Sequence, residues 1–253
     1  MIRYFDPKRD RKERTGMVPF CVNAKTISDA WFQLIYNLFD HAYTQDIQQG
    51  SFENEQYRLQ YPGIAAYVEY PGIDMVPVMP PGLGIPSPTT MEYIEDYFVH
   101  YLMDPTLAEN ETYKYASRIH QPMPKGGTQL ERVIEMLKKT PLTNQAVVEI
   151  GTPEDHDVCF GNDGKLDPPC LRLLDFKAVP KEGKLILTVS CYFRSWDLWA
   201  GFPTNLGGIQ LLKKLVASEA GLSDGPMYAY SAGAHIYGYH EEIARMRTLK
   251  TKA

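Results

Sequence analysis

Apolar residues recur at helical spacing in four stretches of the chain. The first predicted helix begins near Thr26 or Ser28, which are residues of the kind that cap helices. Further helices are predicted over residues 91–102, 129–139 and 206–220, the last with a Gly-Gly-Ile-Gln start that would allow close packing. The apolar face of the first helix consists of Trp31, Leu34, Ile35, Leu38 and Phe39.

Strand-like runs occupy much of the remaining sequence. Two of them flank the turn at residues 181–183 and predict a hairpin within the stretch 167–205. Shorter strands are predicted at 61–70, 145–150 and 227–230. Helices and strands are mixed without regular β-α-β alternation, and this favours the α+β fold class.

Two segments follow neither pattern. Residues 1–16 crowd lysine and arginine together and predict a basic, solvated N-terminal arm, although Arg14 could instead fold over an anionic ligand. Residues 62–88 are rich in proline, which predicts an irregular loop that could also cover a site. Neither segment marks a clear domain boundary, so we expect one domain over residues 1–253.

Composition narrows the classes of function. A net charge of −5 and a pI near 5.7 argue against a general nucleic-acid binder. The four cysteines have no Cys-x-x-Cys spacing, so neither a common zinc site nor a disulfide framework is predicted. The N-terminus lacks an apolar signal-peptide core, and no apolar run has the length of a membrane span. We therefore expect a cytoplasmic protein without metal, DNA or membrane partners.

Candidate chemistry gathers on the predicted hairpin. Cys170 follows two prolines and is a candidate nucleophile if a cation favours its thiolate; otherwise it is a small buried residue. Arg194 or Arg172 could supply that cation. Asp197 stands among large apolar neighbours, so we expect it to be buried with polar partners.

Two further polar sets have alternative interpretations. Asn205 could cap a helix, or its amide could read the edge of a base by donating and accepting at once. His235 and Tyr237 face the same way if their segment is extended. They could form a structural pair, or they could hold a sugar hydroxyl.

The order of these motifs resembles the thymidylate synthase family. Three strings carry the resemblance: P-P-C at 168–170, F-R-S-W-D-L-W-A-G-F-P-T-N at 193–205 and A-H-I-Y-G-Y-H at 234–240. The family has P-C-H, Q-R-S-x-D-x-x-x-G-x-P-x-N and G-D-x-H-x-Y-x-N-H. The resemblance covers roughly residues 113–240 and implies a mixed-sheet α+β fold that dimerises through its sheet. It also implies C5 one-carbon transfer from methylenetetrahydrofolate, or a related reduced pterin, to a pyrimidine nucleoside 5′-monophosphate, with dUMP favoured.

The resemblance implies a role for each matched residue. Cys170 would add to C6 of the pyrimidine, and Arg194 and Ser195 would bind the phosphate, with Arg194 also favouring the thiolate. Asn205 would recognise the uracil edge. The remaining matches are His235 and Tyr237 for the sugar hydroxyl, Asp197 and Gly201 for the folate, Tyr113 for proton removal at C5, and Glu95, with Glu92 in reserve, for the catalytic glutamate.

The chain departs from the family at the phosphate site. The paired arginines that a partner subunit lends to the phosphate fall on Asn144 and Gln145, so Arg14, Arg58 or Arg118 is expected to replace them. Leu171 and Phe193 stand where the family has His and Gln.

We also expect no counterpart of the family's C-terminal lid, which closes over the folate. An open site would let water capture the methylene intermediate, so 5-hydroxymethylation of dUMP, dCMP or CMP is the alternative to methylation. A further alternative is an inactive relative that binds a nucleotide or RNA.

Overall fold

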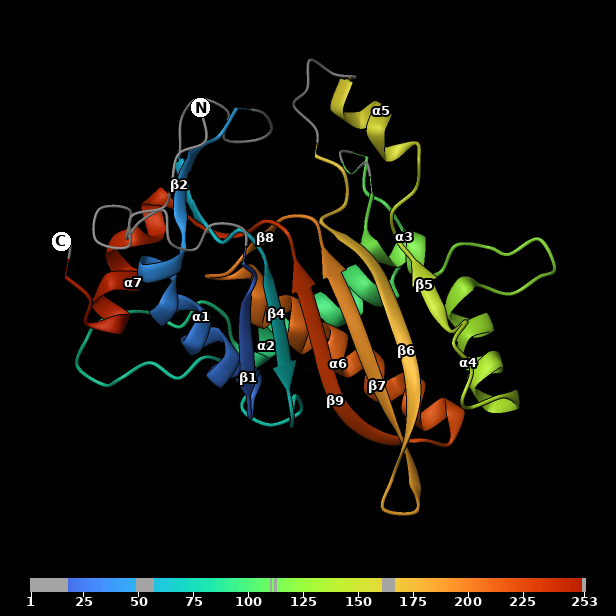
Figure 1. Ribbon diagram of the computed structural model, residues 1–253. Helices are drawn as coiled ribbons and strands as arrows, with labels where there is room; N and C mark the ends of the chain where they lie inside the picture. The colour runs from blue at the N-terminus through green and yellow to red at the C-terminus, as the bar shows by residue number, and fades with distance from the viewer. Residues whose placement is uncertain (1–17, 49–56, 110, 112, 161–166, 252–253) are drawn as a thin grey trace, which may run out of the picture.

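A computed structural model describes residues 18–48, 57–109, 111, 113–160 and 167–251 (Figure 1). The predicted basic arm over residues 1–16, Arg14 included, lies outside the described residues. Among the described residues, no helix is both long and apolar enough to cross a membrane.

A six-stranded mixed sheet forms the centre of the molecule (Figure 1). In spatial order its strands are β1 (Phe20–Ala24), β4 (Ile64–Val68), β9 (Ser223–Ser231), β7 (Lys184–Phe193), β6 (Leu171–Lys181) and β5 (Val147–Glu149). The β1–β4 and β7–β9 pairs are parallel, and the other three pairs are antiparallel. The predicted α+β class with a mixed sheet is confirmed.

The predicted hairpin is the pair β6 and β7. Its turn contains Glu182 and Gly183 at φ of 51° and 76°, a backbone conformation that glycine adopts without steric cost. Because the two strands are antiparallel, Leu171 at the start of β6 pairs with Phe193 at the end of β7. Cys170 and Arg194, the next residues outward, therefore lie side by side.

A four-stranded sheet adjoins that end of the hairpin. Its order is β2 (Tyr43–Asp46), β3 (Tyr57–Gln60), β10 (Ala234–Tyr237) and β8 (Trp196–Asp197). β8 begins just after β7, and β10 runs parallel to it with His235 opposite Asp197. On its other side β10 is antiparallel to β3, with Tyr237 opposite Arg58. The small sheet thus gathers side chains from distant parts of the sequence around the end of the hairpin.

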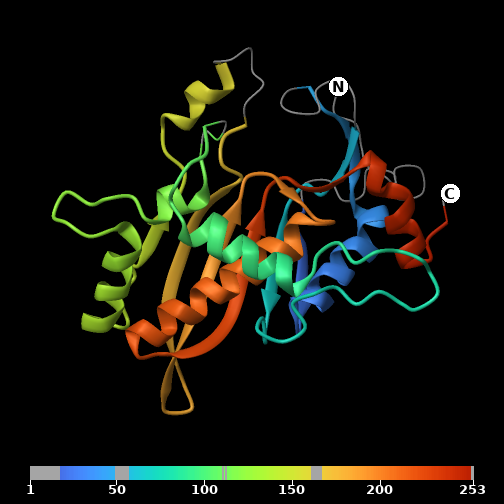
Figure 2. The same cartoon turned by 180° about the vertical axis from the view of Figure 1, so that it is seen from behind.

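Helices cover one face of the six-stranded sheet. α6 (Gly201–Ala220) crosses this face, and α2 (Met91–Tyr97) lies over α6 (Figure 2). α1 (Ile27–His41) packs on the same face beside β1. The remaining elements are α3 (Tyr115–Ile119), α4 (Gln129–Lys139), α5 (Asp155–Phe160), α7 (Glu241–Thr248), the π-helical turn η1 (Phe98–Met103) and the 3₁₀ turn η3 (Gly238–His240).

Capping chemistry explains where the helices begin. The Thr26 hydroxyl accepts the Asp29 N–H at 3.2 Å, which confirms the predicted start of α1. α4 has the predicted bounds, with Thr128 and Glu131 as its capping box. α6 begins at Gly201 and not at the predicted residue 206, because a carboxylate outside the helix satisfies its first N–H groups and because proline is tolerated in a first turn.

Glycine lets α2 approach α6 closely, as the Gly-Gly start predicted. An added Cβ at Gly207 would lie 2.8 Å from Cγ2 of Ile94, and one at Gly208 would lie 2.6 Å from Cδ1 of Tyr97. Real Cβ atoms do not approach that closely. The glycines therefore decide how near the Tyr97 ring can come to the α6 backbone.

The proline-rich segment lies along α1 and α7. Residues 69–90, all of them described, form neither helix nor strand. The Ser28 N–H donates to the Asp74 carbonyl at 3.0 Å, and the Val78 N–H donates to the Ser28 hydroxyl at 3.1 Å. Arg247 of α7 donates to the Val78 carbonyl at 2.8 Å. A role for this loop as a cover over a site stays a prediction.

Candidate active site

Cys170 lies on a loop that Arg194 holds in place. The guanidinium donates from Nε to the Pro169 carbonyl at 3.2 Å and from Nη2 to the Pro168 carbonyl at 2.5 Å. The Arg194 N–H also donates to the Cys170 carbonyl at 2.9 Å. The thiol residue is half-buried at the start of β6. The structure therefore brings the predicted nucleophile and the predicted cation together.

The electrostatic surroundings of the thiol act in opposite directions. Burial raises the pKa of Cys170 above its ordinary value, and the charge of Arg194 is the largest influence that lowers it. Asp167 raises the pKa further, whereas Arg172 and Arg58 lower it. Burial prevails, so the thiol is mostly protonated near neutral pH, and three guanidinium groups are placed to favour the thiolate when it forms.

Tyrosine side chains surround the thiol. A charge on Cys170 contributes to the raised pKa of Tyr97, Tyr101, Tyr113, Tyr115 and Tyr237. Burial is the largest cause in each case, and it raises the pKa of Tyr101 and of Tyr237 to about 12. The Tyr115 hydroxyl accepts the Leu171 N–H at 3.2 Å, beside the thiol. These phenols are neutral hydrogen-bonding groups at physiological pH.

Sequence reasoning found only part of this tyrosine set. Tyr113 and Tyr237 are among the predicted site residues, whereas Tyr97 and Tyr101 fall in the predicted helix 91–102, where helical spacing places them on its apolar face. Their rings do stack on that face, with centroids 5.3 Å apart. Because a tyrosine ring packs like a hydrophobic residue and ends in a polar group, helical spacing alone cannot show where the hydroxyl points.

Asp197 organises the start of α6. Its carboxylate accepts the N–H groups of Trp199, Ala200 and Gly201 at 3.0, 3.1 and 3.1 Å. The residue is half-buried, and these bonds are the partners that a carboxylate among apolar neighbours requires. An added Cβ at Gly201 would lie 3.3 Å from the Asp197 Cβ, so glycine permits this close turn. The predicted folate contacts of both residues stay predictions.

Asn205 lies in the second turn of α6 and not at a cap. Its Oδ1 accepts the indole N–H of Trp196 at 2.9 Å. An indole N–H can only donate, so this bond fixes which end of the amide faces Trp196. The NH₂ group remains available on the other side, and base recognition by Asn205 stays a prediction.

His235 and Tyr237 are adjacent on β10, as an extended segment predicts. Their rings meet edge to face with centroids 4.8 Å apart. His235 is only 1% exposed, and its Nδ1 lies 2.8 Å from the Gly233 carbonyl, which assigns the ring proton to Nδ1. Burial lowers the pKa of His235, so the ring is neutral and its Nε2 is an acceptor. Among the described residues, Nε2 has no hydrogen-bond partner.

Two arginines that were candidates for phosphate binding differ in their surroundings. Arg58 of β3 lowers the pKa of Cys170, His235 and Tyr237, so it lies among these groups. Its buried Nε has no hydrogen-bond partner in the described part of the chain.

Arg118 of α3 is engaged elsewhere. It donates to Asp155 at 2.9 Å and to Thr152 at 3.1 Å. Asp155 is 3% exposed and also accepts from Arg172 at 2.8 Å, so these four residues form one ion-pair network. Substrate binding by Arg118 stays a prediction.

The remaining predicted residues are less centrally placed. Ser195 is half-buried between Arg194 and β8. Glu95 and Glu92 of α2 are exposed, whereas Ile94 and Tyr97 of the same helix contact α6. The structure does not bring either glutamate into the group around Cys170, and the catalytic role of Glu95 stays a prediction.

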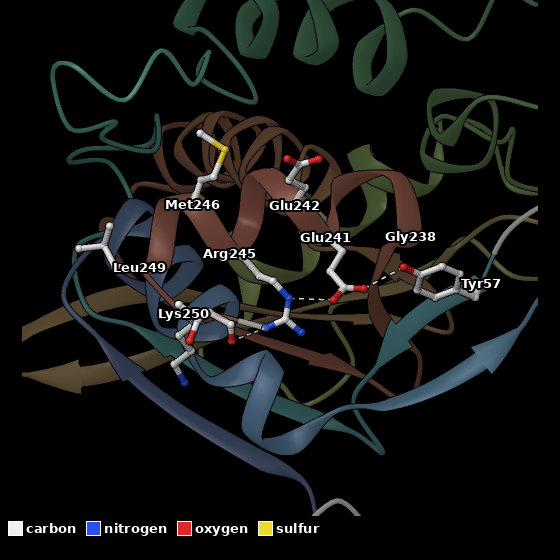
Figure 3. Close-up of a pocket in the computed structure, with 9 residues that line it drawn as sticks. Tyr57, Gly238, Glu241, Glu242, Arg245, Met246, Leu249 and Lys250 are labelled. Atoms are coloured by element: carbon white, nitrogen blue, oxygen red, sulfur yellow. Dashed lines mark hydrogen bonds and ion pairs between the residues drawn. The ribbon is translucent and has the colours of Figure 1, made fainter. Parts of the chain in front are cut away.

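A cavity of about 660 Å³ lies beside α7 (Figure 3). Tyr57 and Arg245 both point toward Glu241 there; the Tyr57 hydroxyl donates to its Oε2 and the Arg245 Nε to its Oε1, each at 2.8 Å. These bonds join β3 to α7 and help to position the small sheet. Among the described residues, no group of three or more His, Cys, Asp or Glu side chains could hold a metal ion.

Comparison with known proteins agrees with the motifs. The profile of the thymidylate synthase family matches residues 101–252. The chain is 28% identical to a protein of Methanosarcina acetivorans named "Putative thymidylate synthase", over 86% of this chain and 89% of that protein. Proteins of the same name from Methanosarcina barkeri and Methanococcoides burtonii are each 29% identical over the same shares.

The fold and the family profile together define the class, and the chain belongs to the thymidylate synthase family. The resemblance found in its motifs is thereby confirmed. Membership supports an enzyme that transfers a one-carbon unit to a pyrimidine nucleotide, with methylenetetrahydrofolate as the co-substrate of the family.

Proposed function

We propose that this protein transfers a one-carbon unit from methylenetetrahydrofolate, or a related reduced pterin, to C5 of a pyrimidine nucleoside 5′-monophosphate. The observation that carries the proposal is the arrangement of Cys170 and Arg194. The guanidinium holds the thiol loop by two carbonyl groups and also counteracts the effect of burial on the thiol pKa. Such an arrangement favours a thiolate nucleophile.

The nucleotide contacts follow from groups with capacity left for a ligand. The phosphate lies against Arg194, Ser195 and Arg58, because guanidinium groups bind phosphate by charge-assisted hydrogen bonds. The sugar hydroxyl donates to Nε2 of His235, a buried acceptor, with Tyr237 beside it.

The base is read by Asn205. Since Oδ1 accepts from Trp196, the NH₂ group is the part of the amide that faces a ligand. An amide donor suits the O4 acceptor of uracil, and dUMP is the favoured substrate.

The chemistry begins with attack by Cys170. An S–C6 bond forms while the C5–C6 electron pair moves toward O4, and this makes C5 nucleophilic. When bound, methylenetetrahydrofolate supplies the one-carbon unit that C5 attacks. Loss of the C5 proton, assisted by Tyr113, would break the bond from the one-carbon unit to the folate nitrogen and leave a methylene group on C5. A hydride from tetrahydrofolate, which would thereby become dihydrofolate, would then add to this methylene as Cys170 is expelled and give a methyl group. Hydroxide from water would instead give a hydroxymethyl group and leave tetrahydrofolate.

The residues present fit a pterin. Asp197 accepts three backbone N–H groups and has roughly one further lone-pair direction for a donor. Tyr239 is 50% exposed and stacks on Tyr237 with centroids 5.4 Å apart, so it offers an aromatic face. The charge of Asp197 acts on both tyrosines, so carboxylate and rings belong to one neighbourhood. A flat heterocycle with N–H donors matches that pairing, and the absence of a side chain at Gly201 leaves room beside the Asp197 carboxylate.

A homodimer is part of the proposal. The face of the six-stranded sheet opposite α6 carries partly exposed aromatic side chains, namely Tyr67, Tyr192, Tyr228 and Tyr230. Tyr67 and Tyr228 contact each other across β4 and β9 at 5.4 Å between centroids. An apolar sheet face of this kind is suited to packing against a second copy.

The test is incubation with methylenetetrahydrofolate and dUMP, UMP, dCMP or CMP, followed by mass spectrometry of the nucleotide. We expect a methyl product and dihydrofolate with dUMP. A hydroxymethyl product with tetrahydrofolate would assign the hydroxymethylase alternative.

Cys170→Ala should abolish turnover, whereas Cys21→Ala on the exposed edge of β1 should not. Turnover retained by Cys170→Ala would contradict the proposed mechanism. Nucleotide binding without product or C5 proton release in the unaltered protein would indicate the inactive relative.

A further inference from the structure

The hydroxyl of Tyr97 is buried without a satisfied hydrogen bond. Among the described residues it has no partner of full hydrogen-bond geometry, and solvent does not reach the oxygen. Leaving a phenol in this state costs about 1–3 kcal/mol. Tyr97 ends α2 at the point where the helix becomes π-helical, an irregularity found often at functional sites.

Packing fixes the direction of this side chain. The ring lies against Gly208 of α6, one helical turn after Asn205, and stacks on Tyr101. Both Asn205 and Cys170 are near enough to influence the pKa of the Tyr97 hydroxyl. The phenol is therefore near both the predicted base reader and the predicted nucleophile.

The hydrogen bond from Trp196 to Asn205 determines which end of the Asn205 amide faces Tyr97. Trp196 donates to Oδ1 of Asn205, so the end of the amide that meets Tyr97 is its NH₂ group. A donor from Asn205 lowers the pKa of Tyr97, but burial, which is the larger cause, raises it well above the ordinary value. Tyr97 consequently keeps its proton at neutral pH. That proton faces no acceptor in the described part of the chain.

We propose that the Tyr97 hydroxyl donates a hydrogen bond to the acceptor at position 4 of the pyrimidine, and so both selects uracil and stabilises the adduct with Cys170. The inference rests on the proposed function. When the thiolate forms the S–C6 bond, the C5–C6 electron pair moves through C4 and places negative charge on O4. A preorganised donor at O4 is then worth more in the transition state than in the bound substrate.

Discrimination between bases follows from the same geometry. Uracil presents an oxygen at position 4, which accepts from Tyr97. Cytosine presents an amino group there, and this donor would face the phenol proton and the Asn205 NH₂ group. Two donors in contact lose a hydrogen bond that the buried phenol needs, so cytosine nucleotides should bind more weakly.

The experiment compares Tyr97→Phe with Tyr93→Phe. Tyr93 lies on the same helix and is 59% exposed, so its substitution controls for changes to α2. Release of deuterium from C5 of labelled dUMP measures attack by Cys170, and calorimetry with dUMP and dCMP measures base selection.

We expect Tyr97→Phe to slow deuterium release about 100-fold at saturating nucleotide, the effect of removing an oxyanion donor. The preference for dUMP over dCMP should shrink about tenfold. Tyr93→Phe should match the unaltered protein.

A second pair of variants separates the effect of moving the Tyr97 ring from a general loss of stability. Gly208→Ala would push the Tyr97 ring away, whereas Gly207→Ala would press on Ile94 in the same helix contact. We expect both variants to lose similar thermal stability. Gly208→Ala should nevertheless slow deuterium release more than Gly207→Ala does. Equal losses of exchange would assign Tyr97 a packing role only.

The outcomes distinguish this inference from the proposed function. If the unaltered protein releases deuterium and Tyr97→Phe releases it as fast, the inference is overturned and the proposed function stands. If the unaltered protein neither binds dUMP nor releases deuterium, the proposed function fails and the inference fails with it.

Discussion

The side chains around Cys170 and those of the cavity beside α7 satisfy their polar groups in opposite ways. In the α7 cavity, Tyr57 and Arg245 both donate hydrogen bonds to Glu241, so these donors and acceptors are satisfied within the protein. Around Cys170, the buried atoms Arg58 Nε, Tyr97 Oη and His235 Nε2 have no partner of full hydrogen-bond geometry among the described residues. Both regions contain charged and aromatic side chains, so composition alone does not separate them.

The difference favours the region around Cys170 as the ligand site. Buried polar groups without partners cost stability, and proteins keep them where a substrate supplies the missing partner. A paired set such as Tyr57, Glu241 and Arg245 instead stabilises the fold. The presence of a cavity therefore says less about function here than the hydrogen-bonding capacity that the side chains leave for a ligand.

The largest expected effect concerns Arg58 and Arg118, the two phosphate candidates within the described residues. Arg58→Gln should weaken dUMP binding roughly 10- to 100-fold, because a charge-assisted hydrogen bond contributes about 1.5–3 kcal/mol. The measurement is calorimetric titration with dUMP.

Arg118→Gln is the matched variant. It should lower the free energy of unfolding by about 1–3 kcal/mol, because Asp155 would lose one of its two arginines, and it should leave dUMP affinity unchanged. A loss of affinity in Arg118→Gln alone would assign the phosphate to Arg118, which the sequence left as one alternative beside Arg14 and Arg58.

A smaller effect concerns the reactivity of Cys170. Burial raises the pKa of this thiol, so the protonated form dominates at neutral pH and the thiolate appears only as the pH rises past that of a free thiol. The rate of alkylation by iodoacetamide should accordingly rise at a higher pH for Cys170 than for a cysteine in an unstructured peptide.

Arg194→Gln should slow this alkylation several-fold at a fixed pH, because the largest influence that lowers the pKa is lost. Peptide mass spectrometry separates Cys170 from the other cysteines. Faster alkylation in Arg194→Gln would show that the guanidinium shields the thiol more than it activates it.

The smallest effect is expected in the α7 cavity. Tyr57→Phe removes one hydrogen bond to Glu241 while Arg245 keeps its ion pair, so we expect a loss of about 1 kcal/mol in the free energy of unfolding. Denaturant titration measures this loss, and deuterium release from dUMP should not change. A clear loss of exchange with full stability would make the α7 cavity part of the working site.

The fold could be predicted from sequence where the information is local. Thr26 and Thr128 mark helix starts because each satisfies N–H groups a few residues away. The turn at Glu182 and Gly183 sets the register that places Cys170 beside Arg194. The predicted start of α6 was wrong because the regular apolar spacing begins only at Leu206, whereas Asp197, four residues before Gly201, already bonds the Gly201 N–H.

The features of the candidate site can likewise be divided into those that the sequence predicts and those that depend on the tertiary structure. The amino-acid sequence by itself determined the hairpin, the α+β class and the string that marks the family, since all three depend on neighbours along the chain. Only the tertiary structure decided that Arg58 lies with His235, that Arg118 is bound by Asp155, and that the hydroxyl of Tyr97 faces Asn205. These relations join residues far apart in sequence. Their physical cause is packing between elements, which sets where a polar group ends and whether any partner remains for it.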